Sequence, residues 1–218
     1  MIHELGTENT VFNQFLAELR DSSIQKDSLR FRLNLERIGE IFAYEISKEM
    51  NYAPVKVSTP LAMLDMSLLS EQPVLATILR AGLPLHQGLL NYFDKADSAF
   101  VSAYRKYTKN ENFTIKLDYM SSPSIDGRIL IVSDPMLATG GSLVASIRGL
   151  FEKGTPAHTH VVCALASDEG IAKLKRAFTF KKLTLWVGAI DMELTAKAFI
   201  VPGLGDAGDL AYGRKDEI

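Results

Sequence analysis

Cysteine is almost absent from this chain of 218 residues, and Cys163, the only one, lies in an apolar run. One cysteine cannot form an internal disulfide, and disulfides belong mainly to oxidising compartments. We therefore expect a buried, reduced thiol in a cytoplasmic protein. The start of the chain, Met1–Leu5, also lacks the basic and apolar regions of a secretory signal peptide, which favours the same compartment.

Long apolar runs and an excess of positive charge are missing as well. No run approaches the roughly 18 apolar residues of a membrane span. Lys and Arg number 24 against 26 Asp and Glu, which leaves a net charge of -2. Proteins that grip nucleic acid across a broad face usually cluster Lys and Arg there. The composition therefore predicts a soluble globular protein whose partners include neither a membrane nor a nucleic acid.

Metal-binding patterns are not evident either. The four histidines are not spaced as metal ligands with each other, with cysteine or with carboxylates; they are His3, His86, His158 and His160. We therefore expect no structural metal held by the protein itself. The Walker phosphate-binding pattern is also missing, because no Lys follows Gly141.

The most informative stretch runs from Ile129 to Ser142. An apolar run ends in the carboxylate of Asp134 and is followed by a segment of small residues, Ala138 to Ser142. This pattern predicts a buried parallel strand, a phosphate-binding loop and a helix that Ser142 would cap. Backbone N–H groups of the loop and the positive end of the helix would then face an anion.

Asp134 must have a different role, because a carboxylate beside a phosphate repels it. A carboxylate can instead accept hydrogen bonds from sugar hydroxyls. A phosphate-binding loop next to such an acceptor indicates a phosphorylated ribose as ligand.

Short apolar runs alternate with helical patterns from residue 74 onward, which predicts an α/β fold with a parallel sheet flanked by helices. The expected strands are 74–79, 99–103, 129–132, 161–166 and 183–189, and the expected helices lie near 84–93, 142–153 and 168–177. Before them, apolar residues at helical spacing predict a helical N-terminal part over residues 1–60. A polar and aromatic segment, 106–128, interrupts the alternation and predicts a β-hairpin arm or a flexible lid.

Three charged residues each follow an apolar run: Arg80, Arg105 and Asp134. Ligands of open parallel sheets bind beyond the carboxyl ends of the strands. We therefore expect the two arginines and the carboxylate to face one crevice, where the cations could bind a pyrophosphate.

The C-terminal segment Gly203–Gly208 matches Gly-x-Gly-x-x-Gly, but a dinucleotide site is excluded because too few residues follow for a βαβ unit. Pro202, the three glycines, Asp206 and Asp209 predict an irregular loop, whose backbone could bind a small planar molecule.

Taken in order, these motifs resemble the uracil phosphoribosyltransferases, of the type I phosphoribosyltransferase superfamily. The resemblance covers nearly the whole chain and rests on Asp134–Ser142 together with Phe31-Arg32 through Gly39 to Tyr44-Glu45, Thr59-Pro60-Leu61, Ile78–Leu83, Tyr104-Arg105, Glu169-Gly170-Ile171 and Ile200–Asp209. It implies transfer of a 5-phosphoribosyl group from 5-phosphoribosyl-1-pyrophosphate (PRPP) to N1 of uracil, giving UMP and pyrophosphate.

The resemblance also implies roles for individual residues. Asp134, Arg80 and Arg105 would be catalytic. The PRPP-binding residues would be Arg80, Arg105, Asp134, Pro135, Met136, Leu137, Ala138, Thr139, Gly140, Gly141, Ser142 and Asp206. Uracil would contact Ile200, Gly205, Asp206 and Ala207. Mg²⁺ would arrive with PRPP, and a strained or cis peptide would lie near Arg80-Ala81.

At the level of the whole protein, the resemblance implies a single domain over residues 1–218, with a uracil-binding hood at 191–218. It also implies GTP binding and assembly into a homo-oligomer of two or more chains. Residues 106–128 depart from the family pattern, which leaves a catalytically silent or regulatory pyrimidine-sensing paralogue as an alternative. A purine phosphoribosyltransferase is a second alternative, because a phosphate loop alone does not select a base.

Overall fold

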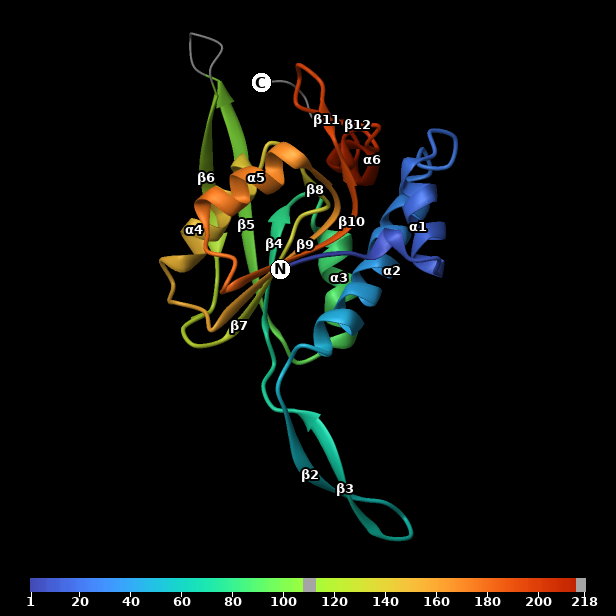
Figure 1. Ribbon diagram of the computed structural model, residues 1–218, viewed down its shortest axis with the longest axis vertical. Coiled ribbons are helices and arrows are strands. Elements are labelled where there is room, and N and C mark those ends of the chain that lie inside the picture. Colours follow the sequence, from blue (N-terminus) through green and yellow to red (C-terminus); the bar gives the residue numbers. More distant parts are fainter. Residues whose placement is uncertain (108–112, 215–218) are drawn as a thin grey trace.

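The computed structural model describes residues 1–107 and 113–214, and for residues 103–107 and 113–117 it describes the backbone alone. Its centre is a mostly parallel sheet in the strand order β1-β10-β9-β7-β4-β5-β6, with the short β8 paired to β9 (Figure 1). The strands are β1 (Ile2–Glu4), β4 (Val74–Leu79), β5 (Asp97–Tyr107), β6 (Phe113–Ser121), β7 (Ile129–Ser133), β8 (Met136–Leu137), β9 (His158–Ser167) and β10 (Leu183–Asp191). The predicted α/β architecture is confirmed.

Helices cover both faces of this sheet. One layer consists of α1 (Val11–Arg20), α2 (Ser28–Ser47) and α3 (Leu83–Tyr92), and the other of α4 (Gly141–Phe151) and α5 (Asp168–Ala177). Because helices cover both faces, a central strand buries side chains on each of them. In β9, Val162 and Ala164 pack against the first layer, while Val161 and Cys163 pack against the second. The single cysteine is a core residue, as predicted.

The expected helical N-terminal part is wrong at its end. Residues 52–58 form β2 (Tyr52–Ser58), which pairs antiparallel with β3 (Met63–Leu69) in a hairpin that projects from the molecule (Figure 1). The local cause is strand-like alternation of Val55 and Val57. Thr59 closes the turn, because its Oγ1 accepts the N–H groups of Leu61 and Ala62. Strand β1 is a second departure from the helical expectation.

A second hairpin explains the polar segment after residue 103. Strand β5 is longer than the predicted 99–103, because its outer half pairs with the antiparallel β6 after β4 has ended. The hairpin thus pairs residues 100–107 with 113–121, whereas the predicted arm was 106–128, and Ile125, within the predicted range, is fully buried in the core. The tip at 108–112 lies outside the described residues.

Among the residues described, no helix is both long and apolar enough to cross a membrane.

Candidate functional site

The direction of strand connections reverses between β4 and β7. From β4 the chain passes through α3 to β5 on one side, whereas β7, α4, β9, α5 and β10 extend the sheet on the other. A crevice for ligands opens at such a reversal, beyond the carboxyl ends of the strands. Thr77 of β4 is paired with Ser133 of β7, so Arg80 and Asp134 follow neighbouring strand ends, as predicted.

Asp134 lies directly beyond β7, where its backbone N–H donates to the carbonyl of Val162 at 3.1 Å. Its side chain is half-buried. Burial raises the pKa of Asp134 to about 7, although the N–H of Met136, which donates to Oδ1 at 3.3 Å, acts in the opposite direction. A carboxylate that is costly to ionise without a partner suits a site completed by hydroxyl donors of a ligand.

The loop after Asp134 ends at the N-terminus of α4. The predicted cap is wrong: Gly140, with φ 73° and ψ 0°, is the N-cap residue, and Ser142 lies in the first helical turn. Glycine adopts this left-handed conformation without the steric cost that a serine would incur. The first N–H groups of an α-helix have no partner within the helix. Those of Gly141 and Ser142 therefore lie where an anion is best stabilised.

Two residues of the β9–α5 junction hold this loop, and sequence reasoning did not give them that role. The hydroxyl of Ser167 donates to the carbonyl of Ala138 at 2.6 Å and accepts the N–H of Gly170 at 3.0 Å. A Cβ on Gly170 would lie 2.4 Å from the Ala138 carbonyl oxygen. The loop therefore rests directly on the start of α5, which accounts for Gly170 in the motif Glu169-Gly170-Ile171.

The first residues of the loop are structural. Met136 and Leu137 form β8, which pairs with Leu165 and Ala166 of β9. Pro135 is buried, and the side chain of Leu137 is 1% exposed in the core. Their side chains therefore face the protein, whereas Ala138 and Thr139 are half-buried at the helix end.

Arg80 connects the end of β4 with the C-terminal segment. Its Nη2 lies 3.4 Å from Asp209 Oδ1 and donates to the carbonyl of Gly213 at 3.2 Å. The peptide bond Leu79–Arg80 is cis, one bond before the predicted position. Gly82 lies close to the end of β7, since a Cβ on this residue would lie 3.0 Å from the carbonyl oxygen of Ser133.

Arg105 does not end a strand. Its backbone lies within the outer half of β5, paired with Ile115 of β6, and its side chain is outside what the structure describes. The prediction failed because the apolar run stops at Ala103 while the strand continues as part of the arm.

The C-terminal segment folds over the carboxyl ends of the strands as a hood (Figure 1). It contains a short hairpin of β11 (Glu193–Leu194) and β12 (Ile200–Val201), a cis peptide before Pro202, and α6 (Ala207–Tyr212). The expectation of an irregular loop through Asp209 is therefore wrong from Ala207 onward. The cause is Asp206, whose Oδ1 accepts the N–H of Asp209 at 3.0 Å and caps α6.

The residues predicted to contact uracil lie together in this hood. Ile200 and Ala207 are 3% and 4% exposed and belong to the core, whereas Gly205 and Asp206 are exposed. Gly205 has φ 94°, which favours glycine. The side chains of Ile200 and Ala207 are therefore committed to packing, whereas Gly205 and Asp206 form the exposed part of this segment.

Helix α2 supports the hood from below. Arg32 donates from Nη1 to the carbonyl of Ala211 at 2.7 Å, and its guanidinium lies 5.8 Å from the ring centre of Tyr212. A cation at the last carbonyls of a helix stabilises its C-terminus. This contact gives Arg32 of the motif Phe31-Arg32 a structural role, which its position in the sequence did not reveal.

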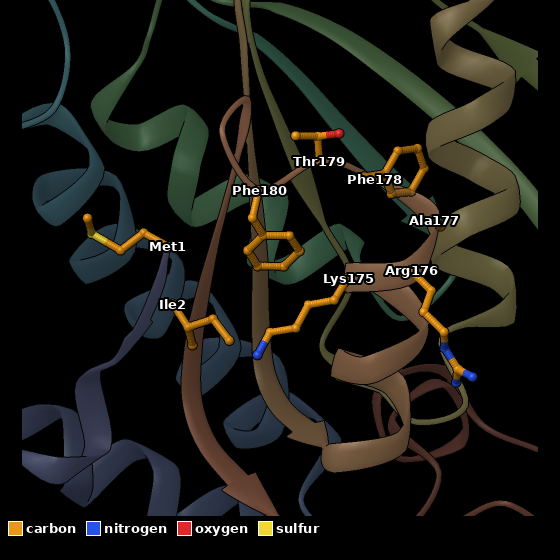
Figure 2. A pocket seen from close by; sticks show the side chains of 8 residues that line it. All are labelled: Met1, Ile2, Lys175, Arg176, Ala177, Phe178, Thr179 and Phe180. Carbon is orange, nitrogen blue, oxygen red and sulfur yellow. The ribbon is translucent and has the colours of Figure 1, made fainter.

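A separate cavity has a volume of about 580 Å³, and Figure 2 shows the side chains that line it. It is lined by Met1, Ile2 and the segment Lys175–Phe180, at the end of α5 and before the start of β10. That position is the amino end of the strands, so the cavity is not the crevice described above. The described residues also include no group of three or more His, Cys, Asp or Glu side chains that could hold a metal ion.

Similarity to known proteins agrees with this geometry. The sequence model of the family described as uracil phosphoribosyltransferase matches residues 7–214. A uracil phosphoribosyltransferase of Porphyromonas gingivalis is 50% identical over 215 residues, with 99% of each chain covered. One of Pyrococcus furiosus is 39% identical over 208 residues, which cover 94% of this chain and 87% of the relative. The solved structure of the AQ2163 protein from Aquifex aeolicus superposes with a TM-score of 0.85 at 29% identity, covering 98% of both chains. The chain therefore belongs to the uracil phosphoribosyltransferase family.

Proposed function

We propose that this member of the family transfers the 5-phosphoribosyl group of PRPP to N1 of uracil, giving UMP and pyrophosphate. In the reaction a bond forms between N1 and the anomeric carbon, the bond from that carbon to pyrophosphate breaks, and the N1 proton is lost. The observation that carries the proposal is the placement of Arg80, Asp134 and the α4 N-terminus around the reversal of strand connections, with the hood directly above.

The phosphorylated ribose binds at the end of β7. Backbone N–H groups and hydroxyls of Thr139 to Ser142 hold the 5-phosphate, since this loop ends at the positive end of α4. Asp134 accepts hydrogen bonds from the ribose hydroxyls. A charge-assisted hydrogen bond is worth about 1.5 to 3 kcal/mol, and those donors offset the cost of ionising a half-buried carboxyl.

The pyrophosphate lies toward β4 and β5. Arg80 binds it and, through Asp209, joins the leaving group to the hood. The family resemblance assigns Arg105 of the arm to the same pyrophosphate, although its side chain is outside what the structure describes. Mg²⁺, which prefers phosphate oxygens, water and one or two carboxylates, would come bound to PRPP and would supply positive charge to the leaving group. Two carboxylates fit this modest requirement: Asp134 at the end of β7 and the exposed Asp206 of the hood, which the family resemblance assigns to PRPP.

Uracil binds beneath the hood, against the backbone of Ile200, Gly205 and Ala207, with Asp206 alongside. Uracil presents an acceptor, a donor and an acceptor along one edge, whereas cytosine presents a different order. A rigid backbone that pairs with the first order leaves groups unpaired with the second. Sites of this kind discriminate by about 10⁴ or more.

A homo-oligomer is part of the proposal, and the β2–β3 hairpin supports it. One face of the hairpin consists entirely of apolar residues that alternate along both strands: Ala53, Val55, Val57, Leu64, Met66 and Leu68. Val55, Leu64, Met66 and Leu68 are each more than 40% exposed. A contiguous apolar face of this kind marks an interaction surface, and a second copy of this chain covers it.

The proposal also places the protein in the cytoplasm as a single domain over residues 1–218. The buried thiol of Cys163 supports the compartment, because burial raises its pKa well above the ordinary value and leaves it unreactive. GTP binding, which the family resemblance implied, stays a prediction that added GTP tests through a shift in melting temperature.

The direct test is an assay of purified protein with uracil, PRPP and Mg²⁺, in which UMP and pyrophosphate are measured together. We expect equal amounts of both products, and turnover of cytosine and of hypoxanthine at least tenfold below that of uracil. No UMP above background at millimolar substrates would support the silent paralogue. Hypoxanthine turnover close to that of uracil would support the purine enzyme.

A further inference from the structure

A buried ion pair joins the end of α1 to the end of β10. Arg20 donates from Nη1 to Asp191 Oδ2 at 2.8 Å and from Nη2 to Oδ1 at 2.9 Å. The side chain of Asp191 is only 7% exposed. A guanidinium that binds both oxygens of a carboxylate fixes the orientation of both groups.

Both members of the pair also hold the backbone of Gly203. Its N–H donates to Asp191 Oδ2 at 2.9 Å, and its carbonyl accepts Arg20 Nη1 at 3.1 Å. One residue of the hood is therefore held on its donor and on its acceptor by a single ion pair. Since the contact between Arg20 and Gly203 spans 183 positions, the sequence alone gave no indication of it.

Gly203 is placed to determine the path of the hood. Its φ is 59°, and a Cβ at this position would lie 2.0 Å from the carbonyl oxygen of Ile200. Leu204, next in the chain, is 4% exposed in the core. Ile200 and Gly205, to which uracil binding is assigned, lie three residues before and two residues after Gly203.

From these contacts we propose that Arg20 and Asp191 are positioning residues for the base. They hold the peptide groups of residues 200–205 in the orientation that pairs with uracil, although neither is assigned a contact with the substrate. This inference rests on the proposed function and names the device behind its base specificity. We call this ion pair the clamp, because it fixes the backbone conformation of the loop.

The electrostatics favour a role in geometry over one in stability. Burial acts to raise the pKa of Asp191, but the hydrogen bonds from Arg20 and Gly203 and the positive charge of Arg20 outweigh it, so the pKa is lowered. The pair is therefore ionised at neutral pH. A buried ion pair often adds little net stability relative to apolar residues of similar size, whereas its fixed directions orient the peptide groups that it contacts.

The matched control is a second ion pair in the same helical layer. Arg30 donates from Nε and Nη2 to the two carboxylate oxygens of the buried Glu18, each at 2.8 Å. None of the contacts described for this pair reaches the hood. Glu18→Gln thus removes a comparable charge from the same layer without releasing Gly203.

The test compares Asp191→Asn and Arg20→Lys with Glu18→Gln and wild type. For the first two variants we expect the KM for uracil to rise at least tenfold and uracil-over-cytosine selectivity to fall at least tenfold. The KM for PRPP should stay within twofold. For Glu18→Gln, both KM values should stay within twofold, with a lower melting temperature. Hydrogen exchange of the amides at 203–205 should accelerate in Asp191→Asn and not in Glu18→Gln.

Three results would overturn the inference: an unchanged KM for uracil, equal increases for both substrates, or the same uracil defect in Glu18→Gln. Calorimetric binding of PRPP identifies variants that retain their fold. If Asp191→Asn does not fold, the milder change Arg20→Lys carries the test. The exchange measurement does not depend on turnover. An inactive wild type would therefore count against the proposed function, while slow exchange of 203–205 in every variant would count against the clamp.

Discussion

Arg80 and Asp209 lie 3.4 Å apart, although 129 positions separate them in the chain. The first follows β4 at the crevice, and the second lies in the first turn of α6. The contact joins the part of the site assigned to pyrophosphate with the part assigned to the base. Binding of PRPP can therefore affect the hood through a single side chain.

Arg80→Ala should weaken PRPP binding far more than uracil binding, because the guanidinium is assigned to phosphate oxygens. We expect at least a tenfold increase in the dissociation constant for PRPP by calorimetry, since hydrogen bonds to charged groups contribute about 1.5 to 3 kcal/mol. Arg128→Ala is the control, because Arg128 pairs with Asp97 at the opposite end of the strands. Equal losses for both ligands would contradict the assignment.

Asp134→Asn should separate activity from stability. The amide keeps the shape but loses the charged acceptor, so kcat/KM should fall tenfold or more. Because the pKa in the folded protein, about 7, is above the ordinary value of 3.8, the folded state holds the proton more tightly. The wild type therefore loses stability as pH rises from about 4 to 7. The variant should melt higher than wild type at pH 8, with little difference at pH 4.

The same pKa governs the activity of the wild type. With Asp134 required as a carboxylate, kcat/KM for PRPP should rise with pH up to about 7 and then level off, because this ratio reports the free enzyme. A profile flat from pH 5 to 8 would remove Asp134 from the ribose site.

Ser167→Ala should disturb the phosphate loop, because it removes the hydroxyl that donates to Ala138 and caps α5. Loss of a serine or threonine N-cap costs about 0.5 to 2 kcal/mol. Thr10→Ala removes a comparable cap, at the N-terminus of α1, without touching the loop. Both variants should lose similar stability, while only Ser167→Ala should raise the KM for PRPP. An effect of Thr10→Ala on that KM of the same size would show that general destabilisation is responsible.

The apolar face of the β2–β3 hairpin should be required for assembly. Met66→Lys places a charge in the middle of that face and should convert the oligomer to smaller species in sedimentation experiments. Ser67→Lys, on the opposite face of the same strand, is the control and should leave the mass unchanged. A monomeric wild type would refute the assembly, and an unchanged mass of Met66→Lys would refute the role of this face.

Five strands of the main sheet, β4, β5, β7, β9 and β10, could be predicted from the sequence because each contains a short apolar run bounded by turn residues. The position of Asp134 and Arg80 at neighbouring strand ends could be predicted as well, because the carboxyl ends of parallel strands lie at the same edge of a sheet. The β2–β3 hairpin was missed because Val55, Val57 and Leu64 do not pack in the core of the chain. Alternation of apolar residues over a strand of seven residues is also only a weak indication of a β-strand. The helix α6 was missed because Gly203 to Gly208 resemble a loop until Asp206 is seen to cap the helix.

The contacts that hold the site could not be read from the sequence. These contacts are made by Ser167, Arg32, Arg20 and Asp191 with backbone groups far away in the chain. Because every residue has a backbone, the sequence does not indicate which backbone groups serve as partners. A serine at the end of a strand and an arginine at the end of a helix are each ordinary as sequence features. Only the folded chain shows that three of these four side chains support the hood.

The contact between Arg20 and Gly203 also joins an early and a late part of the chain. Asp191 Oδ2 and Arg20 Nη1 contact each other, and each of these two atoms also binds the backbone of Gly203. Every strand of the main sheet precedes Gly203 in the chain. A chain cut before Gly203 would therefore keep the strands and the phosphate-binding loop but lose most of the segment assigned to the base.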